Sequence, residues 1–277
     1  EITVMRDDWG KTDPDRSETP SKREHTMDVI VPGVGVEYAI NEFQSVSVGV
    51  HKGFAPPGPG TSGVTDKAVD PETSVNTEIG FKSNQGLNSL EFTLFMNSYD
   101  NLLGADTAAS GGGSDELFNG GAVDISGFEL YLRRILVDNS RIQMPFELAW
   151  TNTNSEFQES FDGFWGDVSK GDELPYLPDT MVSLNLGLNV NKISANISMK
   201  KTSEMRTVAG SGSISGSNAT DEITIIDLGM RYALQDNVTL SVGINNFMDD
   251  DGIAARRPYG ARPTMPRSFN LGVDYTF

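Results

Sequence analysis

The sequence contains no cysteine, few basic residues and no long apolar run. Without cysteine, the chain has neither a disulfide framework nor a thiolate metal site. Only 37% of its residues are hydrophobic, and no stretch approaches the roughly 20 apolar residues that a membrane-spanning helix needs. These features exclude helical membrane spans. They do not exclude the strands of a β-barrel, whose alternating side chains average to a polar composition.

Basic residues are scarce relative to acidic ones. The 277-residue chain carries 21 Lys and Arg against 39 Asp and Glu, which gives a formal net charge of −18. A nucleic-acid-binding surface has to be basic, because it neutralises phosphates. The charge balance therefore argues against nucleic acid as a partner, and the length is compatible with one large β domain.

Alternation of apolar and polar residues is clearest at the C-terminus. The last nine residues place an apolar or aromatic side chain at every second position: Phe269, Leu271, Val273, Tyr275 and Phe277. A period of two puts these side chains on one face of a strand. Chain termini normally fray in water, so a strand that ends on an aromatic residue favours a closed sheet whose apolar face meets lipid. The last strand of a soluble antiparallel sandwich is the alternative.

The same period recurs along the chain and predicts about twelve strands. The predicted strands cover residues 1–6, 34–40, 46–50, 75–81, 90–96, 123–132, 142–150, 182–190, 193–199, 226–232, 238–244 and 269–277. Residues 7–26 read as a charged loop. Within the segment 123–132, Val123 and Ile125 are out of phase with Phe128 and Leu130, so we expect a β-bulge at Ser126-Gly127.

The connections between these strands alternate strictly between long and short. This layout is typical of an outer-membrane barrel, with short turns on the periplasmic rim and long loops outside. A sandwich has no reason to segregate its loops in this way. We therefore predict an all-β fold, an antiparallel transmembrane β-barrel with about twelve strands present. Because residues 1–6 read as a strand already under way and no signal peptide precedes them, we expect a fragment.

Four stretches resemble the C-terminal part of a TonB-dependent outer-membrane receptor of the ferric-citrate or ferric-siderophore type. They are residues 50–60, residues 71–81 with their PE-x-S-x-x-x-E-x-G pattern, residues 118–130, and residues 243–249 followed by 266–269. The last pair is similar to the family's NLFD…PR ending. Met248 departs from it, because that pattern often has Asp or Asn directly after the phenylalanine.

The resemblance implies a barrel of about 22 strands filled by a plug domain. Residues 1–277 would then be a partial receptor barrel, roughly strands eleven to twenty-two, with the plug and the TonB box absent. It further implies a place in the bacterial outer membrane and TonB-coupled import of an iron chelate by the parent protein. The implied partners are membrane lipid, lipopolysaccharide, TonB and the barrel-assembly machinery. For that machinery, the alternating set from Phe269 to Phe277 would be the C-terminal assembly signal.

Other functional classes fit the sequence less well. A passive pore and a self-contained twelve-stranded translocator barrel remain alternatives. Outer-membrane phospholipases are also twelve-stranded and use a Ser–His–Asn site, but neither His25 nor His51 has a serine two positions on. Asp249-Asp250-Asp251-Gly252 lacks the alternating oxygens and the distal Glu of a calcium loop. We therefore predict no catalytic residue, no resident metal and no cofactor. The iron chelate would be the cargo.

Cations on the long-loop side are the candidate ligand contacts. They are Arg256, Arg257 and Arg262 beside Tyr259 in the last loop, and His51 and Lys52 near the end of a strand. Guanidinium groups suit carboxylate-rich anions such as ferric citrate or a siderophore. The alternative is that these arginines pair with Asp249–Asp251 or with lipopolysaccharide phosphates.

An aromatic cluster lies in the predicted loop 152–178. Its members are Phe157, Phe161, Phe164 and Trp165. We interpret the cluster as an interfacial girdle, with a stacking surface for a ligand as the alternative.

Overall fold

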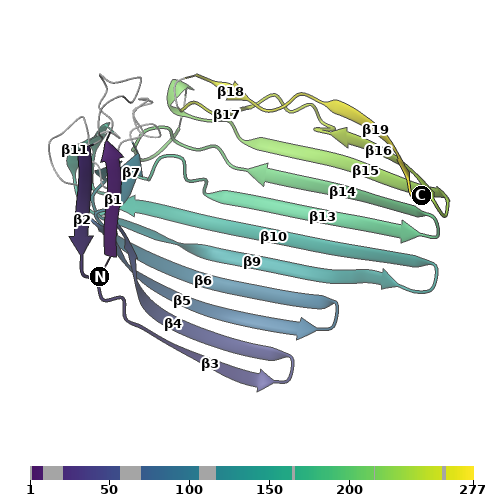
Figure 1. Cartoon of the computed structure of the whole chain (residues 1–277), viewed down its shortest axis with the longest axis horizontal. Coiled ribbons are helices and arrows are strands. Elements are labelled where there is room, and N and C mark those ends of the chain that lie inside the picture. The colour runs from purple at the N-terminus through teal and green to yellow at the C-terminus, as the bar shows by residue number, and fades with distance from the viewer. Residues whose placement is uncertain are drawn as a thin grey trace.

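The computed structural model describes residues 2–8, 21–56, 70–105, 117–163, 166–214, 216–257 and 260–277 (Figure 1). Eleven strands make up the main sheet: β3 (Gly33–Asn41), β4 (Gln44–Ala55), β5 (Glu72–Gln85), β6 (Asn88–Asp100), β9 (Val123–Asp138), β10 (Ile142–Phe157), β13 (Thr180–Val190), β14 (Ile193–Thr202), β15 (Ile223–Gln235), β16 (Val238–Asn245) and β19 (Ser268–Tyr275). Every strand pairs antiparallel with its neighbour along the chain, so the sheet is a simple meander.

Eleven of the predicted strands are confirmed by this sheet. The sheet is open, with β3 at one edge and β19 at the other. Short elements lie outside it, namely β7 (Leu103–Ala105), β8 (Leu117–Asn119), β11 (Phe161–Gly163), β12 (Gly166–Val168), η1 (Gly216–Asn218), β17 (Ile253–Ala255) and β18 (Arg262–Pro263). None of the helical turns in the described ranges is long and apolar enough to cross a membrane.

The prediction that residues 1–6 form a twelfth strand of the same sheet is wrong. They lie in β1 (Ile2–Asp8), which pairs only with β2 (Ser21–Met27) in a separate two-stranded sheet. The predicted charged loop 7–26 therefore contains most of β2. Four of the seven residues of β2 are Lys22, Arg23, Glu24 and His25. Such a segment carries no apolar alternation, which is why the pattern did not predict a strand.

The predicted segregation of loop lengths is confirmed. Turns of a few residues join β3 to β4, β5 to β6, β9 to β10, β13 to β14 and β15 to β16, all at one end of the sheet (Figure 1). The connections at the opposite end are long and carry the short hairpins β7–β8, β11–β12 and β17–β18. We refer to these two ends as the short-turn end and the long-loop end.

One face of the sheet is apolar from strand to strand. The register aligns apolar residues in rows across it, and one such row is Phe146, Leu186, Ile197, Leu228, Ile244 and Phe269. The apolar side chains of this face are not buried in a compact interior. Leu188 is 37%, Leu271 83% and Val273 70% exposed. A continuous exposed apolar face is the outer band of a transmembrane barrel.

The opposite face is polar and rich in small residues. One row across it contains Glu37, Ser47, Gly80, Thr93, Glu129 and Thr151. Three cross-strand ion pairs also lie on this face: Lys82–Glu91 at 3.2 Å, Arg133–Glu147 at 3.6 Å and Arg231–Asp274 at 3.2 Å. Exposed pairs of this kind contribute little stability, so their main effect is to keep the face hydrophilic.

The β-bulge expected at Ser126-Gly127 is wrong. The register is continuous there, with Phe95 opposite Gly127. A Cβ on Gly127 would lie 2.0 Å from the Asn152 carbonyl oxygen, so the glycine allows two backbones to approach closely. The register shift of this pair of strands lies instead at Met144/Pro145. Proline has no N–H to donate to the ladder, which makes it a common position for such an irregularity.

The change of phase that suggested the bulge has another cause. Val123 and Ile125 face the polar side of the sheet, where the long loops cover them. Val123 is fully buried, and it forms one cluster with the buried side chains of Phe157 and Val168. Leu102, Ile125, Phe161, Leu174 and Ala209 surround these three residues. A small apolar core therefore lies between the polar face and the loops, and we call it the loop core.

The loop core also corrects the interpretation of the aromatic cluster as an interfacial girdle. Phe157 is completely buried, and its ring meets that of Phe161 edge-on with centroids 5.7 Å apart. Both residues pack inward and neither borders the apolar band. Phe164 and Trp165 lie outside the described residues.

Candidate ligand-binding surface at the long-loop end

The long loops fold over the polar face of the sheet. The buried residues of this polar face all lie near the long-loop end of their strands: Ser74, Asn76, Val123, Thr153, Ser155 and Phe157. Each belongs to the polar-face register of its strand. The loops thus form a roof over one end of this face, which would be the inner wall of a closed barrel.

Hydrogen bonds join neighbouring loops to one another. Asn119 exchanges two hydrogen bonds of 2.9 Å with the backbone of Asp70. Glu72 accepts a hydrogen bond of 2.8 Å from the Leu103 amide, and Glu159 accepts one of 3.0 Å from the Ala122 amide. The described parts of these loops therefore have fixed relative positions.

Arg206 joins the loop before β13 to the loop between β14 and β15. Its side chain is 9% exposed, and its guanidinium group forms an ion pair with Glu173 and donates to the Gly212 carbonyl oxygen. The Glu173 amide in turn donates to the Gly210 carbonyl oxygen at 2.8 Å. A nearly buried charge of this kind is stable only when it is fully paired. Arg206 is therefore a structural clamp and is not available to a ligand.

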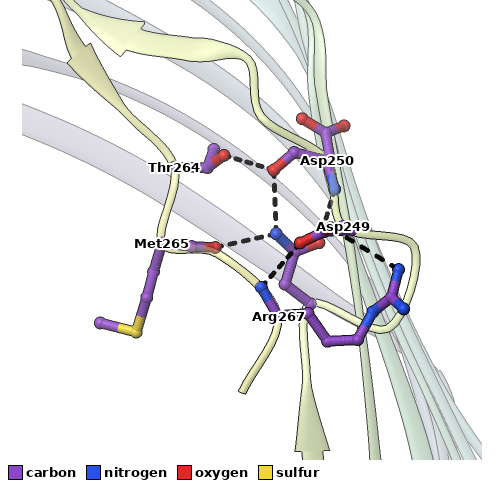
Figure 2. A network of polar contacts seen from close by, with 6 residues as sticks. Asp249, Asp250, Thr264, Met265 and Arg267 are labelled. Carbon is purple, nitrogen blue, oxygen red and sulfur yellow. Dashed lines mark hydrogen bonds and ion pairs between the residues drawn. The ribbon is translucent and has the colours of Figure 1, made fainter.

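The base of the last long loop is held by Asn246, which is 3% exposed. Its side-chain amide donates to the carbonyl oxygens of Asp250 and Met265 at 2.9 and 2.8 Å and accepts from the Asp250 amide at 2.9 Å. Figure 2 shows Asp250, Thr264 and Met265 in this network. The two ends of the loop are thus joined where they leave β16 and enter β19.

Asp249 and Arg267 close the same junction. The Asp249 carboxylate accepts a hydrogen bond of 2.9 Å from the Arg267 amide and lies 3.9 Å from its guanidinium group (Figure 2). The Asp250 carboxylate accepts from the amides of Thr224 and Gly252 at 2.9 and 3.1 Å. These contacts explain the motif residues at both ends of this loop. Asp249 pairs with Arg267, which lies outside the predicted arginine cluster.

The three arginines of the predicted site lie together on the hairpin β17–β18. Arg256 donates through its Nε to the Ala219 carbonyl oxygen, and Arg262 donates to the Arg257 carbonyl oxygen at 3.2 Å. The Ile253 amide donates to the Asp221 carboxylate at 2.7 Å. The hairpin therefore rests on the loop between β14 and β15, with Arg256 and Arg257 half-buried and Arg262 exposed. We call residues 253–257 and 260–263 the arginine arm.

Tyr176 lies against the arginine arm. Burial raises the pKa of Tyr176, and this effect is opposed by the backbone and the positive charges of Arg256 and Arg257. Its φ is +59°. Its hydroxyl oxygen is buried, yet no group in the described ranges meets the geometry of a hydrogen bond to it. The neighbouring arginine amides are therefore close to this oxygen without full hydrogen-bond geometry.

Asp179 is the residue before β13. Burial raises its pKa, the Glu173 charge acts in the same direction, and Arg206 opposes both. Its carbonyl oxygen accepts hydrogen bonds from the Thr153 amide and from the Asn152 side chain, at 2.9 and 2.8 Å. Asp179 therefore adds an acidic group to the end of the same loop.

The remaining predicted contacts are placed elsewhere. His51 and Lys52 are exposed on β4 and point to opposite faces, and seven strands of the sheet lie between β4 and β16. Tyr259 lies outside the described residues. The alternating residues Phe269, Leu271, Val273 and Tyr275 line the exposed apolar face of the edge strand β19, and Phe277 follows the strand with its ring centroid 4.9 Å from that of Tyr275.

Sequence reasoning missed Glu173, Tyr176 and Arg206. Their partners lie between 33 and 81 residues away in sequence and in different loops, and no period marks them. The only local signal is that Tyr176 lies between Pro175 and Pro178. Among the residues that the structure describes, no group of three His, Asp or Glu side chains could hold a metal ion.

An antiparallel meander with an outer apolar band, a polar inner face and a roof of long loops defines the class: the wall of a transmembrane β-barrel. The family model for "TonB dependent receptor-like, beta-barrel" matches residues 5–247. The chain belongs to this family, which consists of receptors rather than enzymes. None of the curated proteins matches the chain.

Solved structures show the same fold. The ferric yersiniabactin uptake receptor of Yersinia pestis has a TM-score of 0.70 at 16% identity, over 94% of this chain and 39% of the receptor. The ferric-catecholate import receptor of E. coli has a TM-score of 0.69 at 17% identity, over 99% of this chain and 40% of that receptor. The outer-membrane ferripyoverdine receptor of Pseudomonas aeruginosa has a TM-score of 0.66 at 17% identity, over 92% of this chain and 35% of that receptor. The chain thus spans 40% or less of the length of these receptors.

Proposed function

We propose that this chain is part of an outer-membrane receptor that imports an iron chelate, ferric citrate or a siderophore, with energy coupled through TonB. The observation that carries the proposal is the meander with its apolar outer face and its roof of loops, in a family whose structural neighbours are siderophore receptors. The long-loop end would face the outside and the short-turn end the periplasm.

In this proposal the arginine arm supplies the first contact with the chelate. Arg256, Arg257 and Arg262 concentrate positive charge in a chain whose formal net charge is −18. Guanidinium groups bind carboxylates with two parallel hydrogen bonds, which suits a carboxylate-rich chelate. His51, on the polar face of β4, would contact a ligand only across the lumen of a complete barrel, whereas Lys52 lies in the register of the apolar outer face.

The test uses the full-length receptor in outer-membrane preparations, with ferric citrate as the probe. Replacing Arg256 and Arg257 together by Ala should weaken binding about tenfold or more, because hydrogen bonds to charged groups are lost. Arg141→Ala is the matched control, since Arg141 is an exposed arginine in the turn at the other end of the sheet. Unchanged affinity in the double variant would remove the arm from the ligand site.

Transport is tested separately in iron-limited cells. Growth on ferric citrate should require both the receptor and TonB. A passive pore would support the same growth without TonB, so a TonB-independent result contradicts the proposal and favours a pore.

A further inference from the structure

The Arg206 side chain fixes the backbone of the loop between β14 and β15. Its guanidinium group is bonded to Glu173, in the loop before β13, and to the Gly212 carbonyl oxygen, six residues further along its own loop. A Cβ added to Gly210 would lie 3.3 Å from Nη1 of Arg206, so the guanidinium group also packs against the turn that leads to Gly212. A nearly buried charge that is bonded on both sides holds these segments together.

The backbone of Arg206 is paired with Ala219, near the other end of the same loop. The two residues form an isolated antiparallel bridge. On one side of the bridge, the Thr207 amide donates to the Asn218 carbonyl oxygen at 2.9 Å. On the other side, the Thr220 amide donates at 2.9 Å to the carbonyl oxygen of the residue before Arg206. Thr207 and Thr220 are both buried, so the position of Ala219 is tied to that of Arg206.

The arginine arm is bonded to the residues at and after Ala219. Arg256 donates through its Nε to the Ala219 carbonyl oxygen. The Ile253 amide donates to the Asp221 carboxylate at 2.7 Å, and the Asp221 amide donates to the Ile253 carbonyl oxygen at 2.9 Å. The hairpin β17–β18 itself has only two residue pairs, with a register shift between them. The place of the arm is therefore set by the loop between β14 and β15 more than by its own ladder.

We propose that Arg206 is a positioning residue for the arginine arm. Its side chain fixes the segment that pairs with Ala219, and Ala219 provides the carbonyl oxygen to which Arg256 is bound. The ion pair between Arg206 and Glu173 thereby controls the place of a guanidinium group in a different loop. The consequence for ligand capture rests on the proposed function above, whereas the placement of the arm does not.

Hydrogen exchange in the full-length receptor tests the placement of the arm. Arg206→Ala should speed exchange of the Asp221 and Ile253 amides about tenfold, because a looser bridge frees the hydrogen bonds between the loop and the arm. Faster exchange that is confined to residues 169–179 and 203–212 would overturn the proposal, since the effect would not reach the arm. Unchanged exchange in all these segments would overturn it as well.

Ser155→Ala is the matched control for general loosening of the roof. It removes the acceptor of the Leu174 amide, next to Glu173, and leaves the ion pair of Arg206 intact. Leu174 should exchange faster in this variant, whereas Asp221 and Ile253 should not. An equal rise at these two amides in Ser155→Ala and in Arg206→Ala would overturn the proposal, because any loosening of the roof would then free the arm.

Arg206→Lys separates the shape of the guanidinium group from its charge, and it decides the matter if Arg206→Ala does not fold. Lysine keeps the charge, but it has one ammonium group in place of the two guanidinium nitrogens that bind Glu173 and Gly212. Exchange at Asp221 and Ile253 should rise about threefold. Wild-type exchange at both amides would overturn the proposal, since the arm would keep its place without these two contacts.

Binding of ferric citrate is the readout for ligand capture. Arg206→Ala should weaken binding about threefold, and should cause no further loss when Arg256 is already Ala, because Arg206 acts through Arg256. Additive losses would overturn the proposal, since independent effects add. If the wild-type receptor does not bind ferric citrate, the proposed ligand is wrong, and the exchange experiment still decides the role of Arg206.

Discussion

The sheet and the roof of loops are stabilised in different ways. In the sheet, most side chains on both faces remain at least partly exposed, and the strands are held by ladder hydrogen bonds. In the roof, buried residues gather: the loop core, the clamp at Arg206 and the junction at Asn246. The sheet therefore depends on its surroundings, lipid outside and whatever fills the lumen inside. The roof carries its own small interior.

Substitutions in the two regions should therefore act through different interactions. Changes on the apolar face should matter through the membrane, because that face has no protein partner among the described residues. Changes in the roof should matter through packing and buried polar groups. Four substitutions test that distinction.

Phe157→Ala should destabilise the roof by about 3–5 kcal/mol, because it removes a completely buried ring from the loop core. The strands should still assemble, so the detergent-folded receptor should keep its heat-modifiable migration while its long loops become sensitive to protease. Leu188→Ala, on the opposite face of the sheet, is the control and should leave the loops resistant. If Phe157→Ala abolished heat-modifiable migration, the stability of the sheet would depend on that of the roof.

Leu186→Arg should destabilise the folded receptor by about 2–4 kcal/mol, the cost of a cation on the lipid face near the middle of a strand. The neighbouring substitution Asn185→Arg places the same side chain on the polar face, opposite Glu147, and should be tolerated. Equilibrium folding into lipid vesicles measures both. If the two variants lose equal stability, the assignment of the two faces is wrong.

Asn246→Ala should cost about 1–3 kcal/mol locally, because it leaves two carbonyl oxygens and one amide without the side chain that binds them. Hydrogen exchange in residues 249–265 measures the effect. Asn191→Ala is the control. Asn191 has a φ of 51°, close to the 50° of Asn246, but it lies exposed in a short turn. A similar loss in both variants would mean that the left-handed backbone, and not the network in Figure 2, accounts for it.

Asp179→Asn should have the smallest effect, and one that depends on pH. The pKa of Asp179 is raised by burial and by Glu173, so the folded state binds its proton more tightly than the unfolded chain does. Its contribution to stability therefore falls as the pH rises from the ordinary aspartate pKa through the raised value. The variant should slow exchange in residues 169–179 at neutral pH and change nothing in acid.

Asp236→Asn, in the turn between β15 and β16, is the control for that pH dependence. It lies at the other end of the sheet, so it should not alter exchange in residues 169–179 at any pH. A pH-independent effect of Asp179→Asn would assign its influence to hydrogen bonding and not to ionisation.

Most strands could be predicted because each one is a local pattern. The alternation in residues 182–190 places Leu184 and Leu186 on one face without reference to any other part of the chain. The strict order of long and short connections then predicts an antiparallel meander. The clustering of Arg256, Arg257 and Arg262 could also be predicted, because all three are close in sequence.

The failures have one physical origin, which is that burial in the roof is set by loops that meet across the sheet. Val123 faces the polar side under the covering loops, so its phase suggested a bulge, and Phe157 is buried in the same core although its aromatic cluster suggested a girdle. Likewise, Arg206 pairs with Glu173, and Tyr176 lies against the arginine arm, across different loops. Strand and face follow from the two-residue period of the backbone, whereas contacts between loops depend on where the whole sheet brings their ends together.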